Sequence, residues 1–278
     1  MRSVRSPESG GADRSMGRSE QIGPDGLKLQ TPDSRLQLLP SALHASNLTV
    51  PGRLEAVSLD LGPGELVAMV GPNGAGKSTL IQALAGLLPA GGTVQWNGQP
   101  LSRILMMERG RRLAWVSQET QFEFAFPVRE VVAQGRYAWG EDQAGVAEAM
   151  AELDLAQLAD RPVTRLSGGE RHRVGLARAL ATRAPLQLWD EPVAQLDVRH
   201  ALEVMRLARH LTDAGGTVVV SLHDLRAAYR FDRVLVLDRG RLVGNGRPHE
   251  VLTASLIRKV FRVEATFVES LVPELPCE

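Results

Sequence analysis

Cysteine and long apolar runs are almost missing from this sequence. Its 278 residues include one cysteine, Cys277, next to the C-terminal residue. One cysteine forms no disulfide within the chain and no cysteine-built zinc site, which fits a reducing compartment such as the cytosol. No uninterrupted apolar stretch approaches the roughly 18 residues that span a bilayer. We therefore expect any attachment to a membrane to go through a partner.

The sequence also lacks an excess of charge of either sign. Lys and Arg together number 32, and so do Asp and Glu. Because there is no overall basic field to gather nucleic acid, we expect no nucleic-acid partner. Apolar residues make up 44% of the chain, which suffices for the core of one large domain or two small ones.

Residues 1–40 show almost no apolar periodicity. They are rich in Ser, Gly, Arg, Asp and Pro, a composition typical of a disordered tail. A targeting peptide is the alternative, but the segment has no apolar middle region and carries Glu8, Asp13 and Glu20. We predict a plain tail here and a second tail at 266–278.

Residues 71–79 read GPNGAGKST and match the phosphate-binding loop pattern. A loop that wraps a polyphosphate turns its backbone N–H groups inward, and this requires positive φ at several positions. Glycine adopts positive φ without a Cβ clash, and Gly71, Gly74 and Gly76 are the glycines available here. We expect Lys77 to reach the β and γ phosphates and Ser78 to bind Mg²⁺. The helix that begins near Lys77 directs its partly positive N-terminus at the phosphates.

The flanks of this loop have the pattern that it requires. Residues 66–70 are a continuous apolar run, which predicts a strand buried on both faces, and apolar residues recur at helical spacing after the loop. Residues 54–61 alternate apolar and polar, and Asn97-Gly98 marks a hairpin turn, so we expect antiparallel strands beside the loop. Between 122 and 165 helical patterns replace strands, which indicates an inserted helical subdomain.

The stretch LSGGE at 166–170 precedes another helical pattern. Ser167 and Glu170 fit the capping box of a helix N-terminus. An ordinary capped helix does not explain Gly168 and Gly169, because each weakens the first turn by roughly 1 kcal/mol. We expect a ligand to approach the backbone at this point.

Two predicted apolar strands are each followed by polar residues whose side chains can bind a metal or transfer a proton. The run at 186–189 leads to Asp190 and Glu191, at the strand end where ligands of parallel sheets collect. We expect Asp190 to hold Mg²⁺ and Glu191 to polarise an attacking water. His223 follows the strand at 217–221 and is either a γ-phosphate sensor or a satisfied polar residue, with Asp224 capping the next helix.

The order of these motifs resembles the nucleotide-binding subunit of ATP-binding-cassette (ABC) transporters over roughly residues 41–265. LSGGE between a phosphate loop and a strand that ends in Asp-Glu is highly specific. The resemblance implies an α/β fold with a P-loop NTPase core, whose mixed, mainly parallel sheet has flanking helices. It further implies an antiparallel β subdomain and a helical subdomain inserted at about 119–165.

The resemblance also assigns roles to residues. Glu191 is implied as the catalytic carboxylate and His223 as the switch histidine, and Mg²⁺ is implied at Ser78, Gln118 and Asp190. ATP is implied to bind to Gly71, Pro72, Asn73, Gly74, Ala75, Gly76, Lys77, Ser78, Thr79 and Gln118. The residues implied to face the γ-phosphate of ATP held by a second copy, in a head-to-tail dimer with two ATP molecules, are Ser167, Gly168 and Gly169.

Residues 122–132 and 260–263 look like the ATPases of metal-chelate importers. Such a subunit sits at the cytoplasmic face of the inner membrane on permease subunits, which receive their cargo from a periplasmic binding protein. The short connection at 90–92 and the short segment near Pro51 favour cobalamin as cargo, with ferric siderophore or haem as alternatives. Less favoured are an exporter ATPase and a soluble ABC ATPase that acts on nucleic acid.

One departure from the family concerns the base of the nucleotide. Family members usually carry an aromatic residue before the loop that stacks on adenine, but residues 41–66 contain no Phe, Tyr or Trp. The guanidinium plane of Arg53 is a candidate replacement.

Overall fold

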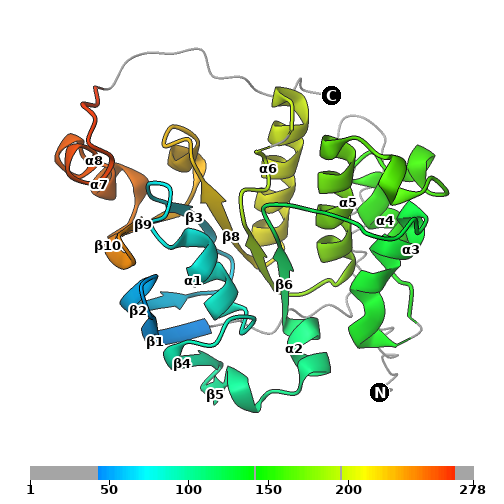
Figure 1. Cartoon of the computed structure of the whole chain (residues 1–278), viewed down its shortest axis with the longest axis horizontal. Coiled ribbons are helices and arrows are strands. Elements are labelled where there is room, and N and C mark those ends of the chain that lie inside the picture. Colours follow the sequence, from blue (N-terminus) through cyan, green and yellow to red (C-terminus); the bar gives the residue numbers. More distant parts are fainter. Residues whose placement is uncertain (1–42, 141, 195, 267–278) are drawn as a thin grey trace, which may run out of the picture. The chain divides into compact units, whose positions relative to one another are not determined.

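The computed structural model describes residues 43–140, 142–194 and 196–266 (Figure 1). The predicted tail at 1–40 and all but the first residue of the predicted tail at 266–278 lie outside the described residues. The described chain alternates strands and helices around two sheets.

The larger sheet has six strands in the order β10-β9-β3-β8-β7-β6. Five of them run parallel, and β10 pairs antiparallel with β9 at one edge. This is the mixed, mainly parallel sheet that the sequence predicts. Its strands are β3 (Leu66–Val70), β6 (Leu113–Val116), β7 (Leu186–Trp189), β8 (Thr217–Leu222), β9 (Arg233–Asp238) and β10 (Arg241–Gly246).

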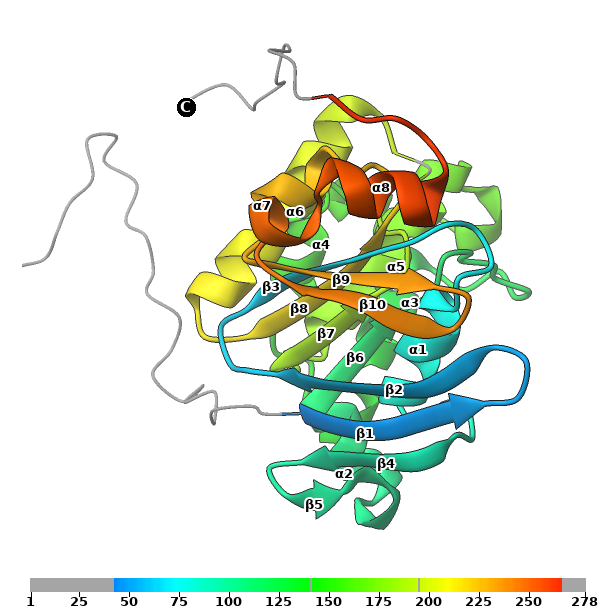
Figure 2. The ribbon, with the colours of Figure 1, turned by 90° about the vertical axis from the view of Figure 1, so that its left-hand side faces the viewer.

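The smaller sheet has four antiparallel strands in the order β2-β1-β4-β5 and lies beside the larger one (Figure 2). The alternating pattern at 54–61 forms a strand with those bounds, and the Asn97-Gly98 turn joins β4 to β5 as predicted. The strands are β1 (Leu43–Val50), β2 (Leu54–Leu61), β4 (Gly91–Trp96) and β5 (Gln99–Pro100).

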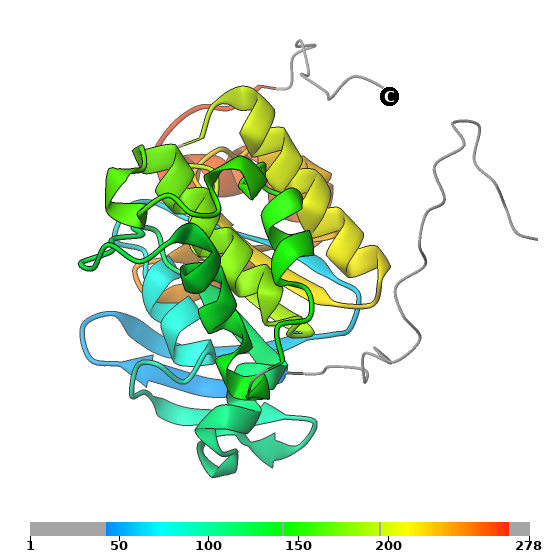
Figure 3. The ribbon, with the colours of Figure 1, turned by 90° about the vertical axis from the view of Figure 1, so that its right-hand side faces the viewer.

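Helices cover the larger sheet, and α3 and α4 pack against α5 (Figures 1 and 3). The described residues between 119 and 165 form helices and one isolated bridge, Pro127 to Pro162, but no strand. The α-helices are α1 (Lys77–Leu84), α2 (Met106–Arg112), α3 (Val128–Ala133), α4 (Val146–Ala151), α5 (Gly168–Ala181), α6 (Val198–Asp213), α7 (Pro248–Val251) and α8 (Ala254–Phe261). Short 3₁₀ segments are η1 (Leu101–Arg103), η2 (Gln134–Trp139), η3 (Ala156–Leu158), η4 (Val163–Arg165) and η5 (Ala227–Arg230).

The continuous apolar run of β3 is explained by a core on each face of the sheet. Leu66, Ala68 and Val70 belong to a cluster shared with the helical subdomain, whereas Val67 and Met69 belong to a cluster shared with the antiparallel sheet. Successive side chains of a strand point to opposite faces, so a strand between two cores has no polar side. Each such Leu, Val or Met contributes about 1.5–3 kcal/mol by burial, and together they fix the start of the phosphate loop.

The structure corrects one part of the loop prediction. Gly74 and Gly76 have φ of 77° and 104°, as expected, but Gly71 is not among the residues with positive φ. A Cβ on Gly71 would lie 2.3 Å from the backbone oxygen of Leu237 in β9. Glycine is needed at 71 because the loop passes close to a neighbouring strand, and not because of its φ.

This contact predicts the cost of adding a methyl group. Gly71→Ala forces backbone apart in a packed region, so we expect a loss of about 2–3 kcal/mol in the free energy of unfolding. Gly62→Ala is the matched control, because φ there is ordinary and a Cβ would meet only Glu65 atoms at 3.6 Å or more. Urea denaturation of both variants measures the difference. Equal stability of the two variants would contradict the packing account.

Candidate functional site

The predicted chemical groups meet at one edge of the larger sheet. The parallel registers pair Val70 with Leu222, Val116 with Trp189 and Trp189 with Val220, so the carboxyl ends of β3, β6, β7 and β8 lie together. A cleft of about 430 Å³ opens there. Its lining residues are Gly52, Arg53, Asn73, Gly74, Ala75, Gly76, Lys77, Ser78, Thr79, Gln118, Glu191 and His223. Most of the predicted site residues are therefore brought together.

Lys77 is the buried cation of this cleft. Its side chain is 6% exposed, and its Nζ donates hydrogen bonds to the backbone oxygens of Gly71 (2.9 Å) and Pro72 (3.4 Å). Burial lowers the pKa of Lys77, and the nearby carboxylates of Glu191 and Asp190 oppose this shift. The ammonium is thus held inside the loop by neutral carbonyl oxygens, which are weaker partners for a cation than an anionic oxygen would be.

Glu191 follows the end of β7 and is tied to two other cleft residues. Gln118 Nε2 donates to Glu191 Oε2 (2.8 Å), and His223 Nε2 lies 2.5 Å from Glu191 Oε1. Glu191 is 7% exposed and has φ of +52°, in the left-handed region that residues with a Cβ rarely adopt. Gln118, Glu191 and His223 therefore form one group of contacting polar side chains, in which Glu191 accepts a hydrogen bond from Gln118 and lies against His223. This group faces the phosphate loop across the cleft.

Asp190 lies behind this group, at 2% exposure, and does not line the cleft. Ser221 at the end of β8 donates its hydroxyl to Asp190 Oδ1 (2.5 Å) and accepts the backbone N–H of Glu191 (2.8 Å). No role for Ser221 was predicted from the sequence. The available signal was a hydroxyl residue that interrupts the apolar strand at 217–222, next to the Asp-Glu strand in a parallel sheet.

Ser167, Gly168 and Gly169 are outside the cleft. Ser167 caps α5 in the predicted capping box, with its hydroxyl accepting from Glu170 N (3.2 Å) and Glu170 Oε2 accepting from Ser167 N (2.6 Å). The second of these bonds is the main reason that the pKa of Glu170 is lowered. The capped end of α5 and the cleft are separate surfaces of this chain.

The turn at 52–53 is packed onto the phosphate loop. A Cβ on Gly76 would lie 2.9 Å from the backbone oxygen of Arg53, and a Cβ on Gly240 would lie 2.6 Å from the same atom. The backbone of Arg53 is therefore fixed between the loop and the β9–β10 turn. Its side chain is exposed and lines the cleft.

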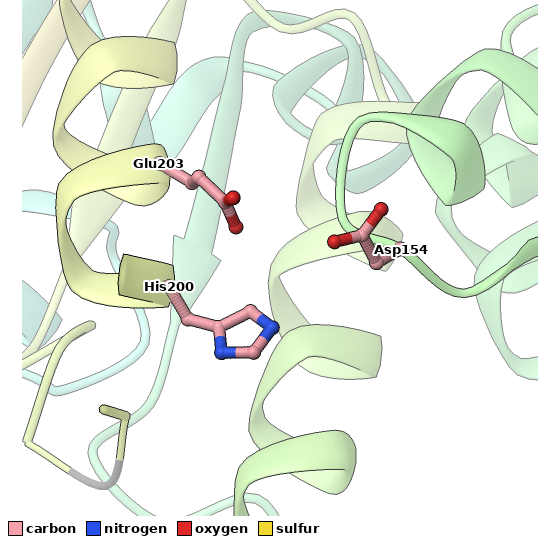
Figure 4. Close-up of side chains that lie close together, drawn as sticks. All are labelled: Asp154, His200 and Glu203. Carbon is pink, nitrogen blue, oxygen red and sulfur yellow. The ribbon is translucent and has the colours of Figure 1, made fainter. Parts of the chain in front are cut away.

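A second cluster of metal-ligand types, away from the cleft, contains Asp154, His200 and Glu203, with ligand atoms within 4.8 Å of one another (Figure 4). Two arginine side chains already contact this cluster. Arg199 Nε donates to Glu203 (2.8 Å), and Arg173 Nη1 contacts His200 Nε2. Guanidinium groups at these positions disfavour a metal cation. The acidic Glu203 is already paired with Arg199 within α6, so we assign no metal to this cluster.

Comparison with solved structures places this architecture among nucleotide-binding cassettes. A dimeric ATP-binding cassette bound to ADP and Pi in a post-hydrolysis state aligns with a TM-score of 0.67 and 25% identity, covering 74% of this chain and 98% of that one. A component of an ABC transporter complex from Clostridium perfringens aligns with a TM-score of 0.66 and 26% identity, covering 80% and 94%. The predicted P-loop NTPase fold is confirmed.

Curated relatives are more similar in sequence. The hemin import ATP-binding protein HmuV of Streptomyces coelicolor is 48% identical over 216 residues, covering 75% of this chain and 77% of the relative. The corresponding Thermobifida fusca protein is 40% identical over 255 residues, covering 87% and 90%. The cobalamin import ATP-binding protein BtuD of Halobacterium salinarum is 44% identical over 217 residues, covering 75% and 54%.

The family model for ABC transporters matches residues 54–194, and the chain belongs to this family. It is a transporter ATPase that binds and hydrolyses ATP. Within the family it is of the metal-chelate importer type, as the sequence predicted. None of the helices in the described part of the chain has the length and apolar character that crossing a membrane requires.

Proposed function

We propose that this chain is the ATPase subunit of a haem importer. The observation that carries the cargo assignment is the similarity to hemin import ATP-binding proteins from several organisms, at 40% to 48% identity over at least 75% of the chain. Cobalamin, which the sequence analysis favoured, is the second candidate. Its support is the halobacterial relative, of which the alignment covers only 54%.

The cleft supplies the groups that ATP binding requires. The loop at 73–79 lines it with backbone N–H groups at the start of α1, and Lys77 supplies the positive charge for the β and γ phosphates. Ser78, Gln118 and Asp190 offer hydroxyl, amide and carboxylate oxygens, the donor types that suit Mg²⁺. When bound, Mg²⁺ neutralises charge on the phosphates. Asp190 would contribute from behind the cleft, where the hydroxyl of Ser221 holds its Oδ1.

Hydrolysis is assigned to Glu191. Its carboxylate is held between Gln118 and His223, so it is oriented before substrate arrives. In this position Glu191 accepts a proton from water that attacks the γ-phosphate, and His223 fixes the carboxylate and contacts the phosphate side of the cleft. The positive φ of Glu191 is a strain that its hydrogen bonds maintain.

The separation of Ser167 from the cleft supports a dimer. A capped helix start with two glycines is suited to an anion but has none to bind in its own chain. In a head-to-tail pair, Ser167, Gly168 and Gly169 of one copy meet the γ-phosphate in the cleft of the other. ATP then joins the copies, and loss of phosphate releases them.

The remaining partners follow from the importer assignment. The dimer would couple to permease subunits at the cytoplasmic face of the inner membrane, and a periplasmic binding protein would deliver the cargo to that permease. No nucleic-acid partner is proposed.

Glu191→Gln tests the catalytic assignment. The variant keeps the size of the side chain but loses the base, so we expect ATP affinity within about twofold of the parent and turnover lowered by at least ~100-fold. Size-exclusion chromatography with ATP should show a trapped dimer. Glu148→Gln, an exposed change on α4, is the control. Turnover at the parent rate would mean that Glu191 is misassigned.

Arg53 is proposed as the contact for adenine. In the described structure its guanidinium makes no hydrogen bond or ion pair, and it lies at the border of the cleft on a backbone fixed by Gly76 and Gly240. A guanidinium plane stacks on a ring and contributes about 0.5–2 kcal/mol. Base selectivity would therefore be weaker than with an aromatic residue.

Arg53→Ala should weaken ATP binding by about 2–30-fold, whereas binding of tripolyphosphate should not change because it has no base. Arg53→Tyr should restore ATP binding. Isothermal titration with both ligands measures the ratio, and Arg206→Ala on the exposed face of α6 is the control. A parallel loss for both ligands would instead assign Arg53 to the phosphates.

The cargo is tested by uptake of labelled haem and labelled cobalamin in cells that lack this chain. We expect haem uptake to be lost and cobalamin uptake to be kept. Parent protein should restore haem uptake and co-purify with a polytopic membrane protein, whereas Glu191→Gln should co-purify without restoring uptake. Loss of cobalamin uptake alone would make cobalamin the cargo, and unchanged uptake of both would overturn the assignment.

A further inference from the structure

His172 is a buried polar residue that the proposed mechanism does not use. It lies on α5, one turn beyond the capped start of the helix, and is 1% exposed. Its Nε2 lies 2.7 Å from the backbone oxygen of Pro192 and donates a hydrogen bond to it. Its Nδ1 has no hydrogen-bond partner in the described structure. An apolar side chain would fill this space without burying an unpaired nitrogen, so the single bond to Pro192 needs an explanation.

Pro192 directly follows Glu191, whose backbone is in the left-handed region. Three elements hold this segment. The N–H of Asp190 bonds to the oxygen of Val116, the last residue of β6, and the N–H of Glu191 bonds to the hydroxyl of Ser221 on β8. The third bond is the one from His172 on α5. A strained backbone persists only where its surroundings hold it on several sides. His172 adds a hydrogen bond to Pro192, which the bonds from β6 and β8 do not hold.

The protonation state of His172 fits this role. A backbone oxygen only accepts, so Nε2 must carry the proton, and the unpartnered Nδ1 is then a bare acceptor. Burial lowers the pKa of His172, with the bond to Pro192 opposing the shift. The ring is therefore kept neutral and in one tautomer.

We propose that His172 is a positioning residue that holds Glu191 in its catalytic geometry and ties it to the capped start of α5. The proposal rests on the catalytic assignment of Glu191 made above. Each chain then links two ATP sites: Ser167 at the start of α5 meets ATP in the partner's cleft, while Glu191 acts in its own. A shift of α5 on closure of the dimer is passed to Glu191 through a single hydrogen bond.

The test compares two substitutions of nearly equal shape. His172→Gln keeps an N–H donor that reaches Pro192, and His172→Met lacks one. We expect the Gln variant to retain kcat within about threefold, and the Met variant to lose about 10–100-fold, since a misplaced catalytic group costs rates of this order. The affinity for ATP, measured in the Glu191→Gln background, should stay within about twofold in both variants, because His172 does not line the cleft.

Controls separate positioning from general destabilisation. His210→Ala, an exposed change on α6, should leave kcat and Tm unchanged. If His172→Met does not fold, His172→Asn gives the second comparison, because its amide is too short to reach Pro192 and it should show the same loss of kcat. Full kcat in the Met or Asn variant would overturn the proposal. So would an equal loss in the Gln variant with a normal Tm, because the hydrogen bond would then not be the cause.

The outcome is distinguishable from failure of the proposed function. If parent protein hydrolyses ATP and Glu191→Gln does not, the ATPase assignment stands whatever the His172 variants do. If Glu191→Gln turns over at the parent rate, the catalytic assignment itself fails, and the positioning role of His172 is overturned with it.

Discussion

The site depends on one buried ammonium. Lys77 lies inside the phosphate loop with its Nζ bonded to backbone oxygens, and Asp190 and Glu191 provide the nearest negative charge. A cation with this little exposure is stable only if anions compensate it. In the proposed complex with ATP, the phosphates would supply further compensating negative charge to this ammonium. The local stability of the loop and the proposed binding of ATP thus depend on the same compensation of the Lys77 charge.

The carboxylates are in turn held by the sheet. Asp190 and Glu191 follow β7, between β6 and β8, and each neighbour contributes a hydrogen bond to the segment. Because both faces of this sheet are covered by apolar cores, the strand ends do not shift independently. The proposed metal-binding and catalytic carboxylates therefore lie at the end of a rigid strand. The helical subdomain packs against α5, whose capped end is proposed to meet the second nucleotide.

The sequence was sufficient for several features that depend on local pattern, although the positive φ expected at Gly71 was wrong. The apolar run at 66–70 predicted a strand between two cores, Ser167 and Glu170 predicted a capping box, and Asn97-Gly98 predicted a hairpin, and the structure has all three. The motif order also sufficed to predict the fold and the family. The domain boundaries and the roles of the site residues stay predictions, and the choice between haem and cobalamin depends on chains other than this one.

Features that depend on contacts between distant segments were not predictable from this sequence. The reason for glycine at 71 is the oxygen of Leu237, and the roles of Ser221 and His172 come from neighbours on other elements. Local pattern carries no information on which distant backbone atom approaches a residue. These residues became visible only when the sheet order was known.

The close passage of Gly71 beside Leu237 has a consequence for biosynthesis. The loop is synthesised before the strand that it rests on, because β9 follows it in the chain. A nascent chain on the ribosome therefore lacks the support that shapes the loop until β9 has emerged. Incomplete chains should neither capture cellular ATP nor compete with finished subunits for it.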